Sequence, residues 1–191
     1  QAARIGWTHP SGQYSVDELL GAAQDRRQQQ DWINAMRWMG AAVSHTDSPD
    51  QWLEYARLSL LSAQANESRR NMYQSRALSA AINAYLRAGN PALAANSLQL
   101  MAEAFEANRR GTDMIPALRL AMQKQPNWIE LSDALDDAIG KYGFRVTEHL
   151  AESDSAAPRI CAEFSEALVK SGVDYTPFVK LPETDMAVTG S

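Results

Sequence analysis

A sharp break in the middle of the chain constrains its fold more than any other feature. The stretch Ala84–Ala94, AYLRAGNPALA, contains Gly89-Asn90-Pro91, residues that end one helix and begin another. Small and apolar residues recur at helical spacing on both sides of the break. Two helices must therefore lie antiparallel with their small residues in contact, as in a helical hairpin. We expect Gly89 to adopt a positive φ, and Ala84 and Ala94 to be buried between helices.

The same alternation of helix starts and stops runs along residues 14–141 and predicts seven helices. The first start is a capping box, in which the Ser15 and Glu18 side chains each bind the backbone amide of the other. The later helices are expected to begin at Asp31, Ser48, about residue 68, Asn90, Gly111–Asp113 and Pro126 or Asn127. Gly140 is expected to close the last helix in a left-handed conformation. Helical hairpins in series usually hold or space other molecules.

The composition of these hairpins resembles that of a degenerate tetratricopeptide array. Ala84–Ala94 resembles the joint of that repeat, and Asp31-Trp32-Ile33-Asn34-Ala35 resembles the opening of its second helix. Residues 1–13 show no period, which indicates a linker or arm. We therefore predict a mainly α protein, with stacked helical hairpins (a tetratricopeptide-like repeat domain) over residues 14–141.

The pattern changes after Tyr142. Apolar residues then lean toward a period of two, which predicts short strands around residues 144–150, 160–164 and 178–181. Three short strands bury too little apolar surface for an independent β-sandwich. We therefore expect residues 142–191 to be the beginning of a β domain that the chain does not complete.

Charge and hydropathy exclude several classes of protein. The net charge is −5, and the arginine pairs lie near predicted helix ends, so the sequence has no basic face for nucleic acid. No apolar run approaches the ~18 residues of a membrane helix. The N-terminal residues lack the charged start and apolar stretch of a signal peptide. We expect a mature or excised segment of a longer protein, held at a membrane only by an anchor outside this chain.

Motifs for catalysis and metal binding are absent from the sequence. The three histidines, His9, His45 and His149, fall in different predicted elements, and no two have metal-ligand spacing. The aspartates of the last predicted helix are better explained as a solvated face than as a calcium loop. No glycine-rich phosphate loop or nucleophile elbow occurs. We therefore predict no catalytic residue, no metal site, no cofactor and no enzymatic activity.

Aromatic residues in the first hairpins are the candidate partner-binding residues. Trp32, Trp38 and Tyr55 would line a groove on the concave face of the array and hold a peptide or a partner protein. The alternative, which is the more common role of buried aromatic residues, is packing within the hairpins.

Cys161 is the single cysteine of the chain, so no internal disulfide can form. A thioester between a cysteine and a glutamine three residues later is also excluded at this place. The residue three positions on is Phe164, whose side chain has no carbonyl group to acylate.

Three segments, in order, closely resemble the beginning of the first macroglobulin-like β domain of bacterial alpha-2-macroglobulin family proteins. These segments are Tyr142–Val146 (YGFRV), Pro158–Ser165 (PRICAEFS) and Gly172–Val179 (GVDYTPFV). The preceding helices resemble the region that this family places upstream, at Ala81–Leu86 and Met114–Leu118. The resemblance covers most of the chain.

The resemblance implies a function that the residues alone do not specify. Members of the family are large cell-envelope proteins that inhibit proteases by entrapment after cleavage of a bait segment, and many carry a thioester that captures the attacker. The chain would be a non-catalytic N-terminal scaffold or interaction module of a broad-spectrum protease inhibitor in the periplasm or cell envelope. Its partners would be proteases, through the full-length protein, and Cys161 would pair with a cysteine outside this chain.

The residues themselves leave a rival open. A tetratricopeptide-type adaptor would bind a peptide or an envelope partner protein in its concave helical face. An enzyme is the weakest alternative, because no pair of residues has the spacing of a nucleophile and its base.

Overall fold

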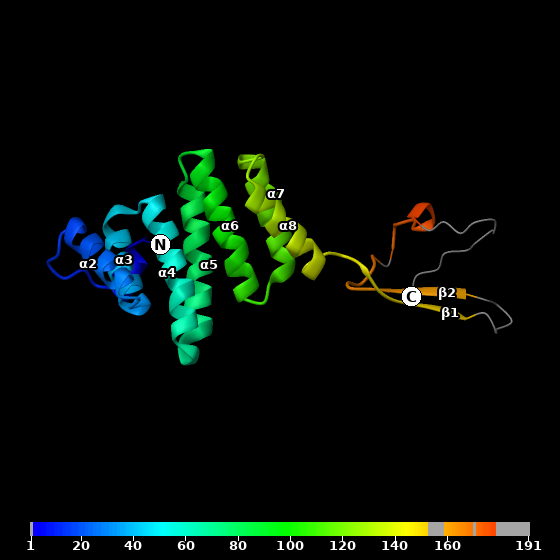
Figure 1. Ribbon diagram of the computed structural model, residues 1–191, viewed down its shortest axis with the longest axis horizontal. Coiled ribbons are helices and arrows are strands. Elements are labelled where there is room, and N and C mark those ends of the chain that lie inside the picture. Colours follow the sequence, from blue (N-terminus) through cyan, green and yellow to red (C-terminus); the bar gives the residue numbers. More distant parts are fainter. Residues whose placement is uncertain (1, 153–158, 170, 179–191) are drawn as a thin grey trace. The chain divides into compact units, whose positions relative to one another are not determined.

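The chain is mainly helical. The structure, a computed structural model, describes residues 2–152, 159–169 and 171–178. It divides into two compact units, Gln1–Tyr142 and Gly143–Ser191. The first unit is built from helices, and the described part of the second contains a two-stranded antiparallel sheet (Figure 1). The prediction of a mainly α protein is confirmed.

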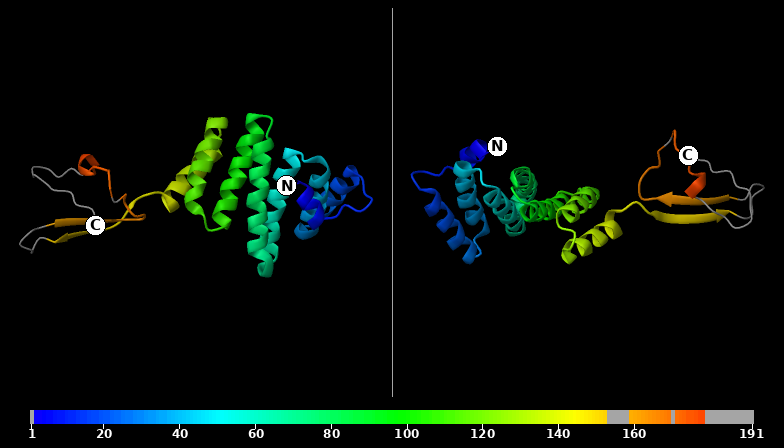
Figure 2. Two further views of the ribbon diagram at one scale, coloured as in Figure 1. Left: turned by 180° about the vertical axis from the view of Figure 1, so that it is seen from behind. Right: turned by 90° about the horizontal axis from the view of Figure 1, so that it is seen from above.

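Consecutive helices of the first unit pack against one another in the order of the sequence. The α-helices described are α1 (Ala2–Thr8), α2 (Val16–Gln28), α3 (Trp32–Thr46), α4 (Pro49–Ala65), α5 (Arg70–Arg87), α6 (Pro91–Ala107), α7 (Met114–Lys124) and α8 (Ile129–Tyr142). Two 3₁₀ turns, η1 (Glu67–Arg69) and η2 (Gly111–Asp113), precede α5 and α7. From α2 to α8 each helix contacts the next, and both views from the side show them next to one another (Figures 1 and 2). Contacts also join α1 to α3 and α4 to α6.

Local sequence sets the helix starts. At α2 the Ser15 amide donates to Glu18 Oε2 at 2.8 Å and the Glu18 amide to Ser15 Oγ at 3.4 Å, which is the predicted capping box. Asp31 caps α3. At α6 the Leu93 amide donates to Asn90 Oδ1 at 2.8 Å. The seven helices predicted between residues 14 and 141 are confirmed as α2 to α8.

The prediction of a linker or arm at residues 1–13 is corrected by helix α1. This helix packs against α3, where a Cβ on Gly6 would lie only 3.2 Å from the Ser44 Cβ. Directly after α1, His9 is buried, with 5% of its surface exposed. Ala2, Ile5 and Gly6 of this helix are partly buried, and Ala2 and Ile5 pack against the core. A face of three small or apolar residues in a helix of seven is too short for its period to stand out in the sequence.

Gly89 does not have the positive φ that we predict from the sequence. Among the described residues the glycines with positive φ are Gly12 and Gly172. The chain leaves α5 at Ala88, whose φ of −59° and ψ of 120° are already non-helical, and Asn90 is extended. The connection therefore reverses direction without a left-handed residue.

Gly140 is not a left-handed cap either, because α8 continues through it to Tyr142. Contacts with α6 and η2 hold this last turn. The Tyr142 hydroxyl donates to Glu106 Oε1 at 2.8 Å, and Lys141 Nζ lies 3.2 Å from the same oxygen. The Tyr142 ring lies so close to Gly111 that a Cβ at this position would clash with it.

Three helices end instead at non-glycine residues in the left-handed region. These residues are Gln30 after α2, Asp47 after α3 and Arg109 after α6, with φ of 58°, 51° and 60°. A side chain in this conformation crowds the backbone, so each of these ends carries some strain.

One large core cluster extends through the helical unit. Trp52 and Tyr55 are the largest fully buried side chains, each with 1% of its surface exposed. Ala84 and Ala94 at the central joint are buried at 0% and 7% exposure. The prediction that two small faces meet in the hairpin of α5 and α6 is confirmed.

The described part of the second unit is a β ribbon of strands β1 (Val146–Glu152) and β2 (Arg159–Phe164). Leu150 pairs with Cys161, and the rings of Phe144 and Phe164 stack with centroids 5.0 Å apart. The predicted strands around residues 144–150 and 160–164 are therefore confirmed.

The prediction of a third strand at residues 178–181 is wrong for its first residue. Phe178 ends the 3₁₀ turn η3 (Thr176–Phe178), in which Pro177 fixes φ and lacks an amide proton for strand pairing. Residues 179–181 lie outside the described residues.

Candidate functional site

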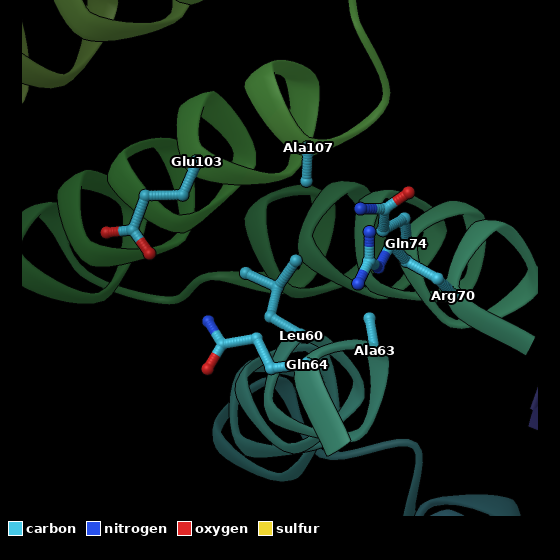
Figure 3. Close-up of a pocket in the computed structure, with 7 residues that line it drawn as sticks. All are labelled: Leu60, Ala63, Gln64, Arg70, Gln74, Glu103 and Ala107. Carbon is cyan, nitrogen blue, oxygen red and sulfur yellow. The ribbon is translucent and has the colours of Figure 1, made fainter. Parts of the chain in front are cut away.

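A shallow open groove lies where α4, α5 and α6 meet. Two cavities of about 460 Å³ and 340 Å³ form it, and both are lined by Leu60, Gln64 and Glu103. Figure 3 shows the residues that line the larger of these two. We call this surface the polar groove and define it by these three residues with Arg70 and Gln74 at one end and Asn96 and Gln99 at the other.

Helical periodicity places the lining side chains on one face of each helix. Both α4 and α6 contribute residues at i, i+3, i+4 and i+7, which share a face of a helix. These residues are Arg57, Leu60, Leu61 and Gln64 from α4 and Asn96, Gln99, Leu100 and Glu103 from α6. Helix α5 lies between α4 and α6 in the sequence, and successive helices of a hairpin series are antiparallel. Helices α4 and α6 therefore run in the same direction, and their lining faces form two walls of the groove.

Glu103 is the charged group at the centre of the polar groove. The residue is exposed, and partial desolvation of its carboxyl raises the pKa above the usual range; Arg57 opposes this shift, and Glu106 adds to it. Both neighbours have partners of their own, since Arg57 lies 2.7 Å from Glu54 and Glu106 lies 3.2 Å from Lys141. Within the described residues, Glu103 has neither an ion pair nor a hydrogen bond.

Amide side chains provide most of the remaining polar surface. Gln64, Gln74 and Gln99 make no side-chain hydrogen bond to any other described residue, so each has a free donor and a free acceptor. Gln64 and Glu103 point into the same space on one side of Leu60 (Figure 3). Arg70 and Gln74 lie next to each other on its other side. The groove therefore offers hydrogen-bonding groups on both sides of an apolar centre.

The aromatic residues predicted to bind a partner do not line this groove. Tyr55 is buried beneath the surface, so its place in a binding face is corrected: a partner cannot reach its ring. Trp32 and Trp38 are half-buried against the core, and Trp38 meets the Tyr14 ring edge to face with centroids 5.5 Å apart. Packing in the hairpins accounts for Tyr55, and partner binding by Trp32 and Trp38 stays a prediction.

Sequence reasoning missed the polar groove because its residues resemble any solvated helix face. The signal that identifies it is the identical spacing of lining residues in two helices, α4 and α6. That spacing becomes meaningful only when the two helices are known to be neighbours across α5.

Cys161 is a free, exposed thiol on β2. The residue opposite it in the ribbon is Leu150. Because Cys161 is the single cysteine of the sequence, no second thiol is available for a disulfide within the chain. The disulfide with a cysteine outside this chain stays a prediction.

Titratable groups elsewhere in the described part of the chain include one buried pair and no metal-ligand cluster. No group of three or more His, Cys, Asp or Glu residues there is placed to hold a metal ion. His9 and Tyr55 form a buried pair, but burial lowers the pKa of the His9 imidazole to about 4 and raises that of the Tyr55 phenol. Both groups are therefore neutral at pH 7, and their contact is structural.

Comparison with known proteins gives no relative, since no family model, curated protein or solved structure matches the chain. Within the described residues, no helix combines the length and the apolar composition that crossing a membrane requires.

Proposed function

We propose that the chain is a non-catalytic scaffold and interaction module, the N-terminal helical part of a bacterial alpha-2-macroglobulin-like protease inhibitor in the periplasm or cell envelope. The observation that carries this proposal is the ordered series of motifs YGFRV, PRICAEFS and GVDYTPFV, which follows directly on a series of stacked helices. In this proposal α2 to α8 form a tetratricopeptide-like array, and β1 and β2 begin a macroglobulin-like domain.

The surface of the β ribbon supports this reading. Val146, Leu150 and Ile160 are 51%, 55% and 61% exposed, although apolar strand residues of this kind are normally covered by a second sheet. A two-stranded ribbon is also only marginally stable alone. Both observations fit a ribbon that forms one part of a larger β domain.

Protease assays test the proposal. The chain alone should leave a common endopeptidase fully active on both large and small substrates. The protein encoded by the complete gene should protect a large protein substrate but not a small peptide, because a trapped protease keeps its active site and small peptides still diffuse in. Stoichiometric inhibition of peptide hydrolysis by the chain alone would contradict the proposal and indicate a direct active-site blocker.

A second function, an adaptor that binds a segment of a partner protein, is favoured by the polar groove. Its free amides and its lone carboxylate are suited to a polar ligand rather than to packing within the protein. The immobilised chain should retain a specific partner from an envelope extract. A Gln64→Ala/Gln99→Ala variant should lose that partner, whereas the control Gln123→Ala, an exposed change on α7, should retain it.

A further inference from the structure

We infer that the polar groove binds an extended peptide segment and that Glu103 selects a lysine or arginine side chain at the centre of that segment. The inference rests on the adaptor function proposed above and adds the chemistry of the ligand. Three features of the groove lead to it: its length, its amide groups and its unpaired carboxylate.

The length of the groove fits a short extended segment. On α6 the lining residues run from Asn96 to Ala107. At a rise of 1.5 Å per residue, this distance is about 16 Å. An extended chain rises about 3.3 Å per residue, so about five residues of peptide fit along the groove.

The amide groups fit a peptide backbone. Each residue of an extended peptide presents one N–H and one C=O, and these groups point alternately to its two sides. Gln64 on α4 and Gln99 on α6 stand on opposite walls, and each offers both a donor and an acceptor. Leu60 on α4 lies between the pair Gln64 and Glu103 and the pair Arg70 and Gln74, where it can contact an apolar part of the ligand.

The charge of the groove decides which side chain fits its centre. Arg57 and Arg70 lie at either side of Glu103, but each already faces a glutamate of its own, Glu54 at 2.7 Å and Glu67 at 3.5 Å. Among the described residues that line the groove, Glu103 is the charged residue without an ion pair. A lysine or arginine would pair with it through charge-assisted hydrogen bonds, which are stronger than those between neutral groups. An acidic side chain at the same place would be repelled.

A peptide array probed with the full chain tests the inference. The probes are acetylated and amidated hexapeptides whose central residue is Lys, Arg, Gln, Leu or Glu and whose other positions are randomised. Peptides with central Lys or Arg should bind the wild type about tenfold more tightly than those with central Gln. The Glu103→Lys variant should reverse this preference in favour of central Glu.

A matched variant controls for the change in net charge. Glu130 is an exposed glutamate on α8, outside the groove, and Glu130→Lys should keep the wild-type preference. Equal binding of all central residues, or a basic preference that survives in Glu103→Lys, would overturn the inference and leave the adaptor function standing. If no peptide binds the wild type, both fail, and the protease assays still decide the inhibitor proposal independently.

Discussion

The His9 imidazole Nε2 lies 3.0 Å from the Tyr55 hydroxyl, and this contact joins the end of α1 to the centre of α4. The two rings meet edge to face, with centroids 5.9 Å apart. Both side chains are buried, and no described residue forms a hydrogen bond with His9 Nδ1. The N-terminal segment is therefore fixed to the helical core by a polar contact that depends on a neutral imidazole.

Protonation of His9 should destabilise the fold in acid. Burial, with smaller effects of Arg76 and Arg37, lowers the pKa of His9 from 6.5 to about 4. In the unfolded chain the His9 imidazole therefore binds a proton below about pH 6.5, whereas in the folded chain it binds one only below about pH 4. The contribution of His9 to stability is complete above pH 6.5 and is lost as the pH falls through this window, by about 3 kcal/mol.

A variant without the titrating group isolates this effect from other acid-linked changes. The free energy of urea unfolding should be measured at pH 7.5, 6.0 and 4.5 for the wild type and for His9→Gln. The wild type should lose more stability than the variant on going from pH 7.5 to 4.5. Identical losses in the two proteins would show that His9 does not titrate in a buried site.

Gly40→Ala should destabilise the protein through the same pair of rings. A Cβ at Gly40 would lie 2.5 Å from Cδ2 of His9 and 2.9 Å from Cε2 of Tyr55, and neither buried ring has room to move away. We expect a loss of about 1–3 kcal/mol from overpacking. Gly21→Ala on α2, where nothing lies within 4 Å of the new Cβ, is the control and should stabilise by about 0.5–1 kcal/mol.

Ala84→Arg should destabilise the central hairpin. Ala84 is completely buried in α5, so the new side chain must either bury a charge or separate the helices. We expect a cost of about 3 kcal/mol or more, seen as a lower melting temperature by circular dichroism. Leu86→Arg, on the same helix at a position 71% exposed, should change stability little. A parent-like melt of Ala84→Arg would mean that the buried face of α5 is assigned wrongly.

Features that depend on a few neighbouring residues could be predicted from the sequence. The capping box of Ser15 and Glu18 and the cap at Asn90 involve side chains within three residues of the amides they bind, so the residue order determines them. The central joint was placed correctly for the same reason. Its backbone conformation was predicted wrongly, because a glycine permits a left-handed turn but does not require one.

Features that depend on distant residues could not be predicted. Helix α1 is held by contacts with α3 and by His9, whose partner Tyr55 is 46 residues away. The polar groove needs α4 and α6 as neighbours, which no local pattern indicates. The left-handed helix ends at Gln30 and Arg109 occur at residue types that rarely adopt this conformation. The backbone preferences of these residue types therefore do not predict such ends.

Gln30 gives a test of how much strain such a helix end contains. With φ at 58° and an exposed side chain, Gln30 ends α2 in the left-handed region, where a Cβ crowds the backbone and glycine does not. We expect Gln30→Gly to raise the free energy of unfolding by about 0.5–1 kcal/mol, because relief of strain exceeds the added entropy of the unfolded chain. Gln24→Gly, an exposed change within the same helix, should lower it by about 0.5–1 kcal/mol. Urea unfolding of the two variants should therefore shift in opposite directions; a loss of stability in both would mean that Gln30 is not left-handed in solution.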